Sequence, residues 1–209
     1  MVEVWFIRHG VTRHNQDGIW QGQRDVPLAP EGYEQARRLA ERLARAGLTW
    51  TALYTSDLAR AAETARILGE RLGLTPRSDR RLREVCVGEL SGLARRDVAE
   101  RYGDYLARSR EDPWNTRFPG GETMAELAER VWRFVEELGG GRYLVVSHGG
   151  AIRAAVLRTL AAATPAPWRI RLENTSITRL RFPEGVAAGG YVDSVGDAAH
   201  LEPGLLPES

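Results

Sequence analysis

Two arginines and two histidines stand where they could act together on a phosphate group. Arg8 and His9 directly follow the apolar run "VWFI", and His148 follows the apolar run "YLVVS". Arg60 lies in "LARAAETA", near the start of an expected helix. Arginine offers a planar, permanently charged fork that matches phosphate oxygens in pairs. A neutral imidazole can attack phosphorus while a second one donates to the phosphoryl oxygens, so these four side chains could carry out phosphoryl transfer if they converge.

The same reaction needs a proton donor, because an alkoxide is a poor leaving group until it is protonated. Glu84 and Glu89 both occur in "RLREVCVGELSG", and we favour Glu84 as the acid because it lies at the end of an expected strand and so at the same edge of the sheet. Each feature also has an ordinary interpretation. A His-Gly pair is often a turn with a surface histidine, and Arg60 could be a helix-surface arginine like most arginines of this chain.

Other designs for phosphoryl transfer do not fit the sequence. The chain contains no lysine, so it has no Walker loop. A cysteine phosphatase loop needs an arginine six residues after its cysteine, and Gly92 occupies that position relative to Cys86. The histidines show no HExxH spacing, and no acidic cluster indicates paired metals. These observations favour a histidine nucleophile that works without a metal ion or a cofactor.

The spacing of apolar residues predicts alternating strands and helices. Strands are expected at residues 2–7, 51–56, 77–84 (a weak pattern), 142–147, 175–182 and 190–195, and helices at 31–47, 58–73, 122–141 and about 151–162. This alternation predicts a three-layer α/β/α sandwich with a mostly parallel central sheet. Ligands bind beyond the carboxyl ends of such strands, so the four residues are expected to meet at one edge of the sheet.

The expected helices each carry an apolar face. The positions expected to face the core are Ala36, Leu39, Ala40 and Leu43 in the first helix, Leu58, Ala62, Ala65 and Leu72 in the second, and Met124, Leu127, Val131 and Leu138 in the third. Ser56 or Asp57 is expected to cap the second helix. Gly47 is expected to close the first helix.

The segment 91–120 differs from the rest of the chain. It is polar and rich in arginine, including Arg95 and Arg96, and it carries three aromatic residues, Tyr102, Tyr105 and Trp114. We interpret it as a small helical cap inserted into a single domain that spans residues 1–201. Residues 202–209 are expected to form a disordered tail.

The bulk composition is that of a soluble globular protein. Of the 209 residues, 43% are hydrophobic and 27% are charged, and the 29 basic residues nearly balance the 28 acidic ones. Nucleic-acid-binding domains usually show a basic excess, so no nucleic-acid partner is expected. The single Cys86 favours a reducing compartment. The first residues do not resemble a signal peptide, and no apolar run is long enough for a membrane helix, so we expect a cytoplasmic protein without a membrane partner.

The motifs together resemble one known family over nearly the whole chain. "FIRHGVTRHN" resembles the RHGxTxxN signature of the histidine phosphatase superfamily, which contains the cofactor-dependent phosphoglycerate mutases and many small phosphatases. "WQGQRDVPLAPEG", "LYTSDLARAAETA", "LREVCVGELSG", "FPGGET" and "VVSHGGAIRA" follow in the family's order. "LENTSITRL" and "GDAAHL" resemble its closing motifs.

The resemblance implies a role for each matching residue. His9 would be the phosphorylated nucleophile, Glu84 would be the acid and base, and Arg8, Arg60 and His148 would clamp the transferred phosphoryl group. Asn15 would contact phosphate or hold His9. Gln21 and Gly22 would line the substrate entrance. Gly149 would let the backbone approach closely. His200 is interpreted as structural rather than catalytic.

Three functions are compatible with this pattern. The favoured one is a metal-independent phosphatase that hydrolyses a small phosphorylated metabolite. The alternatives are a cofactor-dependent phosphoglycerate mutase and a catalytically inactive phosphate-ester binding protein. In the mutases the segment between the acid and the second histidine is longer and carries additional basic motifs, and these are missing here. The sequence specifies neither the ester nor the oligomeric state, although homodimers are common among such enzymes.

Overall fold

A six-stranded sheet forms the centre of the computed structural model, which describes residues 1–162 and 166–202. The strands are β1 (Val2–Arg8), β2 (Ala52–Thr55), β3 (Pro76–Ser78), β4 (Gly141–Ser147), β5 (Ile177–Phe182) and β6 (Tyr191–Asp197), in the order β3-β2-β4-β1-β5-β6. The pairs β2–β3, β2–β4 and β1–β4 are parallel, whereas β1–β5 and β5–β6 are antiparallel. The sheet is therefore mixed, with a parallel half that carries β1 and β4.

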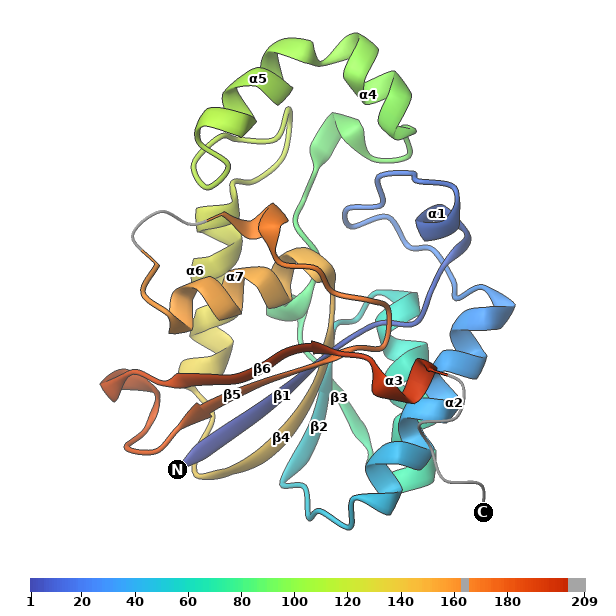
Figure 1. The fold of residues 1–209 in the computed structure, drawn as a ribbon, viewed down its shortest axis with the longest axis vertical. Coiled ribbons are helices and arrows are strands. Elements are labelled where there is room, and N and C mark those ends of the chain that lie inside the picture. Colours follow the sequence, from blue (N-terminus) through green and yellow to red (C-terminus); the bar gives the residue numbers. More distant parts are fainter. Residues whose placement is uncertain (163–165, 203–209) are drawn as a thin grey trace.

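Helices cover both faces of the sheet, as the expected three-layer α/β/α sandwich requires (Figure 1). The helices are α1 (Arg13–Gln16), α2 (Pro30–Arg45), α3 (Ala59–Leu72), α4 (Arg95–Arg101), α5 (Gly103–Glu111), α6 (Met124–Glu136) and α7 (Gly149–Thr159). Pro30 is the first residue of α2, a position where its missing N–H costs nothing. Thr123 caps α6 through a capping box with Glu126.

Alternate residues of the central strands bury into two separate hydrophobic cores. Val4 and Phe6 of β1 pack in one core with residues of α6 and α7, whereas Trp5 and Ile7 pack in the other with residues of α2 and α3. A strand buried on both faces needs apolar residues at consecutive positions, which explains the run "VWFI". Because β1 is packed on both faces, its position in the sheet is fixed, and so is the point at which it ends.

Some local predictions differ from the structure. The weak strand expected at 77–84 is only the three-residue β3, because a 3₁₀ turn at Arg80–Leu82 follows it. The helix that was expected from residue 58 begins at Ala59, and neither Ser56 nor Asp57 caps its N-terminus. Ser56 instead accepts a hydrogen bond from the N–H of Leu58, and Asp57 forms an ion pair with Arg83.

The apolar faces of the helices follow the predicted pattern at all but three positions. Every expected position of α2 is buried, and Gly47 follows that helix with a φ of +63°. In α3, Ala61 and Leu68 are buried whereas Ala62 and Leu72 are only half-buried, so the buried face is rotated from the expected one. Leu138 lies beyond the end of α6 and is also half-buried.

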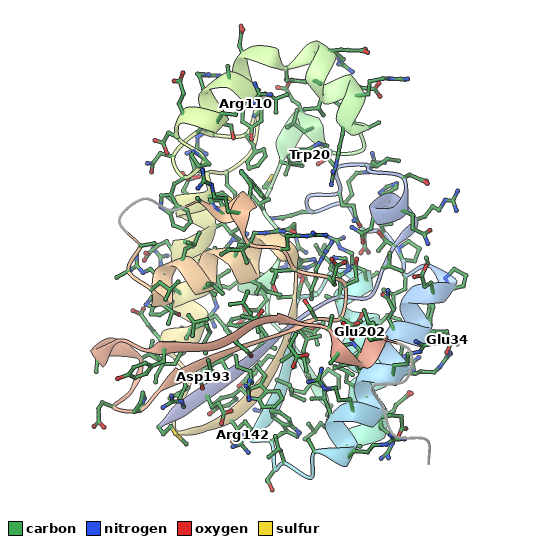
Figure 2. The ribbon with its side chains drawn as sticks, viewed as in Figure 1. Trp20, Glu34, Arg110, Arg142, Asp193 and Glu202 are labelled. Atoms are coloured by element: carbon green, nitrogen blue, oxygen red, sulfur yellow. The ribbon has the colours of Figure 1, made fainter. Side chains whose placement is uncertain are left out.

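Helices α4 and α5 lie together at one end of the molecule, beyond the carboxyl ends of the parallel strands (Figure 1). Figure 2 shows Arg110 on this part of the chain and Trp20 below it, whereas Arg142 and Asp193 lie toward the opposite end. We call residues 91–120 the cap. Most of the expected tail, residues 203–209, lies outside the described residues. Within the described part of the chain, no helix is long and apolar enough to cross a membrane.

Candidate active site

The pairing of β1 with β4 brings the two histidines together. Arg8 lies opposite Ser147 in the parallel register, so His9 and His148 are the next residues of adjacent strands. The N–H of His9 donates to the Ser147 carbonyl at 2.9 Å. The two imidazole rings lie with their centroids 5.1 Å apart. The chain segments that were predicted to meet at one edge of the sheet do meet there.

His9 is held as a neutral imidazole with a defined tautomer. Its side chain is 2% exposed, and its Nδ1 lies 2.7 Å from the Gly10 carbonyl, which can only accept a hydrogen bond. Its Nε2 accepts from Nε of Arg60 at 3.3 Å. Burial, followed by the charges of Arg60 and Arg8, holds the pKa of His9 well below its usual range. The proton is therefore on Nδ1, and Nε2 carries the lone pair that a nucleophile needs.

Arg60 is a buried residue, not a surface arginine of α3. It is 1% exposed, and its two amino groups donate to the carbonyls of Gly22 and Arg24, each at 2.8 Å. Burial lowers the pKa of Arg60 to about 10, so it remains charged at neutral pH. A Cβ on Gly22, whose φ is +51°, would lie 2.7 Å from a methyl group of Val87. A glycine at this position therefore permits the turn that holds Arg60.

Arg8 and His148 keep polar atoms free to meet an anion. One amino group of Arg8 donates to the Leu172 carbonyl at 2.6 Å, while its buried Nε has no partner among the described residues. Neither ring nitrogen of the fully buried His148 has a partner in the described part of the chain. Burial, followed by the charge of Arg60, holds the pKa of His148 well below its usual range. Neutral His148 can therefore donate one hydrogen bond to a phosphoryl oxygen.

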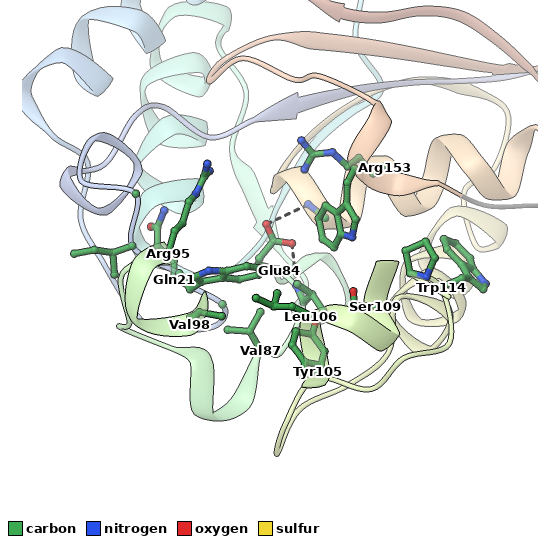
Figure 3. A pocket seen from close by; sticks show the side chains of 18 of the residues that line it. Gln21, Glu84, Val87, Arg95, Val98, Tyr105, Leu106, Ser109, Trp114 and Arg153 are labelled. Atoms are coloured by element: carbon green, nitrogen blue, oxygen red, sulfur yellow. Dashed lines mark hydrogen bonds between the residues drawn. The ribbon is translucent and has the colours of Figure 1, made fainter. Parts of the chain in front are cut away.

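Glu84 reaches the same place from a different chain segment. Its two carboxylate oxygens accept from the N–H of Val85 at 2.9 Å and from the N–H of Gly150 at 3.1 Å. Figure 3 shows the Glu84 carboxylate between Gln21 and Arg153. The alternative acid, Glu89, is exposed and accepts a hydrogen bond from Tyr102 at 3.2 Å. The geometry favours Glu84 as the proton donor.

Gly150 permits close approach at this point, next to the expected Gly149. A Cβ on Gly150 would lie 2.3 Å from Glu84 Oε1. A Cβ on Gly149 would instead meet an amino group of Arg153 at 2.8 Å. Gly150 lines the cavity with Glu84. The first turn of α7 is therefore shaped to receive a carboxylate as well as to place His148.

Asn15 and Gln21 lie in the cavity wall and are joined through Thr12. Oδ1 of Asn15 accepts from the N–H of Thr12 at 3.1 Å, and Gln21 Oε1 accepts from the Thr12 hydroxyl at 3.0 Å. Asn174 Nδ2 lies 3.4 Å from Asn15 Oδ1 and donates to the His9 carbonyl at 2.9 Å. Asn15 is thus connected to the backbone of His9, one of its two expected roles.

These residues open into a cavity of about 1100 Å³. Its floor consists of Arg8, His9, Arg60 and Glu84, and its far wall belongs to the cap, including Tyr105, Leu106 and Trp114 (Figure 3). His148 is fully buried next to His9. No group of three or more His, Cys, Asp or Glu side chains among the described residues could hold a metal ion.

The sequence interpretation did not include Arg153, Trp168 and Asn174. Arg153 and Trp168 line the cavity, and the Arg153 guanidinium lies over the Trp168 ring. The position of Arg153 has a sequence signal, because it is four residues after Gly149 and so shares a face of α7 with it. Trp168 lies in a three-residue 3₁₀ turn (Pro167–Arg169) and Asn174 in a loop, and both are too short for a periodic pattern to indicate direction.

Comparison with known proteins gives a consistent result. The family description "Histidine phosphatase superfamily (branch 1)" matches residues 4–189. A relative from Enterobacter sp., named "Probable phosphoglycerate mutase GpmB", is 37% identical over 217 aligned positions that cover 100% of this chain and 99% of the relative. The GpmB relative from Salmonella newport is 35% identical with the same coverage.

Solved structures share the whole fold. Bacillus stearothermophilus YhfR superposes with a TM-score of 0.87 and 26% identity, covering 97% of this chain and 100% of that one. A mycobacterial glucosyl-3-phosphoglycerate phosphatase, solved as a complex with VO3, superposes with a TM-score of 0.81 and 30% identity, covering 93% of this chain and 98% of that one. The chain belongs to the histidine phosphatase superfamily.

Proposed function

We propose that this protein is a metal-independent phosphatase that hydrolyses small phosphate monoesters through a phosphohistidine on His9. The observation that carries the proposal is the state of His9 itself. Its Nδ1 is tied to the Gly10 carbonyl, and its Nε2 accepts a hydrogen bond from the buried Arg60 in a large cavity that Arg8 also lines. The arrangement supplies a nucleophile and charge stabilisation at one point.

The residues present can perform both half-reactions. In the first, Nε2 of His9 attacks phosphorus, the bond between phosphorus and the ester oxygen breaks, and Glu84 gives its proton to that oxygen. Arg8, Arg60 and His148 stabilise the charge on the phosphoryl oxygens. In the second, Glu84 takes a proton from water, the water oxygen attacks phosphorus, and the N–P bond breaks. The Gly10 carbonyl stabilises the imidazolium of phospho-His9 throughout.

A phosphoglycerate mutase is the second candidate, because the curated relatives are named probable phosphoglycerate mutases. The two activities share the first half-reaction and differ in which group accepts the phosphoryl group from His9. The phosphatases among the similar structures and the short cap support water as the acceptor. A catalytically inactive binding protein is disfavoured, because each position of the site holds a chemically competent side chain.

The test is a panel of phosphate esters assayed with EDTA present. We expect turnover without added metal, and we expect 3-phosphoglycerate to yield free phosphate rather than 2-phosphoglycerate. An enzyme primed with bisphosphoglycerate that interconverts the two phosphoglycerates faster than it releases phosphate would establish the mutase instead. Absence of turnover and of acid-labile phosphate on the protein would favour the inactive alternative.

Glu84→Gln tests the proton donor in the same panel. The variant should slow hydrolysis of alkyl phosphates by roughly 10²–10⁴-fold, the usual contribution of general acid catalysis. Aryl phosphates should suffer less in the phosphorylation step, because their leaving groups need little protonation. Glu89→Gln is the matched control and should leave both substrate classes unaffected. Equal losses for alkyl and aryl esters in single-turnover phosphorylation of His9 would contradict the assignment of Glu84.

A further inference from the structure

A chain of hydrogen bonds, partly buried at Arg42 and buried from His200 onward, leads from α2 to the backbone of His9. His200 lies in a 3₁₀ turn at Ala199–Leu201, in the motif "GDAAHL", and its side chain is 1% exposed. Its Nδ1 is 3.4 Å from an amino group of Arg42, and its Nε2 is 2.9 Å from the Thr175 hydroxyl. Asp197 holds the same Arg42 by two hydrogen bonds, at 2.9 and 2.5 Å.

The partners fix the direction of each hydrogen bond in this chain. The single proton of the Thr175 hydroxyl is donated to the Asn174 carbonyl at 2.7 Å, so the hydroxyl oxygen must accept from Nε2–H of His200. A neutral imidazole has one proton, so Nδ1 is left as an acceptor for Arg42, which can only donate. Burial, followed by the charge of Arg42, lowers the pKa of His200 to about 4, in keeping with this neutral tautomer.

Thr175 connects this chain to the catalytic histidine. Its φ of +59° lies in the left-handed region, where a β-branched residue is rare. Its N–H donates to the Arg8 carbonyl at 2.8 Å and reaches the His9 carbonyl at 3.3 Å. The preceding Asn174 donates from its side chain to that His9 carbonyl at 2.9 Å. A backbone conformation of this kind persists only where the surroundings hold it, and His200 is the group that holds the Thr175 side chain.

We propose that His200 and Thr175 are positioning residues that set the location of the His9 nucleophile from behind. They touch neither the cavity nor the phosphoryl group, and they act through the Asn174–Thr175 backbone on the carbonyls of Arg8 and His9. The inference rests on the proposed function, since it takes His9 to be the nucleophile. A displacement of about 1 Å can lower a catalysed rate on the order of 10²-fold, so such a support has a measurable effect on turnover.

The experiment compares Thr175→Val with Thr175→Ser. Valine keeps the shape and the β-branch but removes the hydroxyl, whereas serine retains the hydroxyl. Thr175→Val and His200→Leu should each lower kcat at least about tenfold and change KM less than about twofold, because Arg60 is held by the carbonyls of Gly22 and Arg24, which neither change touches. Thr175→Ser should keep kcat within about threefold of the wild type.

Thr178→Val is the matched control. Thr178 is a fully buried threonine on β5, and its hydroxyl accepts from the N–H of Gly196 at 3.2 Å, away from the Asn174–Thr175 segment. The Thr178→Val variant should lose about as much thermal stability as Thr175→Val does, but its kcat should equal that of the wild type. An unchanged kcat in Thr175→Val, or an equal loss of kcat in Thr178→Val, would overturn the proposal.

A measurement without turnover separates this inference from the proposed function. In protein with ¹⁵N-labelled histidine, His200 should show the protonated Nε2 tautomer, and Thr175→Val should shift the ring resonances of His9 more than Thr178→Val does. A wild-type protein that fails to hydrolyse any ester would overturn the proposed function alone. His9 resonances that are unaffected by Thr175→Val would overturn the positioning role alone.

Discussion

The floor of the cavity and its cap wall are built on different principles. On the floor, Arg60 is 1% exposed and each of its guanidinium nitrogens has a fixed partner. In the cap wall, Arg95 and Arg110 are exposed and Trp114 is half-buried, although all three line the same cavity. A buried, fully bonded group keeps its position in any complex, whereas an exposed side chain can adapt to its ligand. We infer that the floor determines the reaction and that the cap wall selects the leaving group.

The largest effect should come from the nucleophile on the floor. His9→Ala should fold but lose essentially all turnover, because no cysteine loop or lysine of this chain could replace the histidine. Wild-type protein quenched during turnover should carry acid-labile phosphate, and the variant should carry none. Circular dichroism and the affinity for orthophosphate check that the variant retains its fold and its arginines. Retained hydrolysis in His9→Ala would break the assignment of chemistry to the floor.

The next effect concerns the fork geometry of Arg60. Arg60→Lys keeps the positive charge but cannot donate at once to His9 and to two backbone carbonyls. The expected loss of kcat is on the order of 10²–10³-fold, as for removal of one donor to a developing oxyanion. Arg66→Lys, on the exposed side of the same helix, is the control and should be indistinguishable from the wild type. A loss below about threefold in Arg60→Lys would mean that charge alone suffices.

A smaller effect should appear in the pH dependence of the free energy of unfolding, through His200. The pKa of His200 is lowered to about 4, so the unfolded chain binds more protons at His200 than the folded protein between about pH 6.5 and pH 4. Its contribution is fully present above about pH 6.5 and is lost as the pH falls through this window. His200 should change the free energy of unfolding by at most about 1.4 kcal/mol per pH unit in this window. Urea unfolding at several pH values gives the free energy of unfolding at each pH. Between about pH 4 and pH 6.5 this free energy should change less steeply with pH in His200→Leu than in the wild type. An equal pH dependence in the two proteins would contradict a neutral buried His200.

The smallest effect is expected in the cap wall. Trp114→Ala should raise KM for esters with bulky leaving groups by roughly 2- to 10-fold, which corresponds to the loss of about 0.5–1.5 kcal/mol of aromatic contact. For a small alkyl phosphate the same variant should behave as the wild type, because the leaving group does not reach the cap. Saturation kinetics on a short and a bulky ester give both values. A uniform loss of kcat on the two esters would show that the cap also takes part in the reaction.

Periodicity and local chemistry predicted the main elements of the fold well. The run "VWFI" indicated a buried strand, and the helix faces of α2 and α6 matched their apolar spacing at all but Leu138, since a core imposes its period on the sequence that covers it. The convergence of Arg8, His9, Arg60 and His148 was also predictable, because parallel strands end at one edge of the sheet. Helix capping was less predictable, because Asp57 forms an ion pair with Arg83 and does not cap the N-terminus of α3.

By itself, the sequence determined which side chains can react and which strand ends carry them, because both depend on residue type and on spacing along one segment. Only the tertiary structure decided how those side chains are held. The hydrogen bond of Glu84 with the Gly150 N–H, the close approach at Gly150 and the contacts of Thr175 with His200 and with the His9 carbonyl all depend on segments far apart in the chain. Such contacts leave no periodic trace, since each involves a single residue placed by the packing of the whole domain.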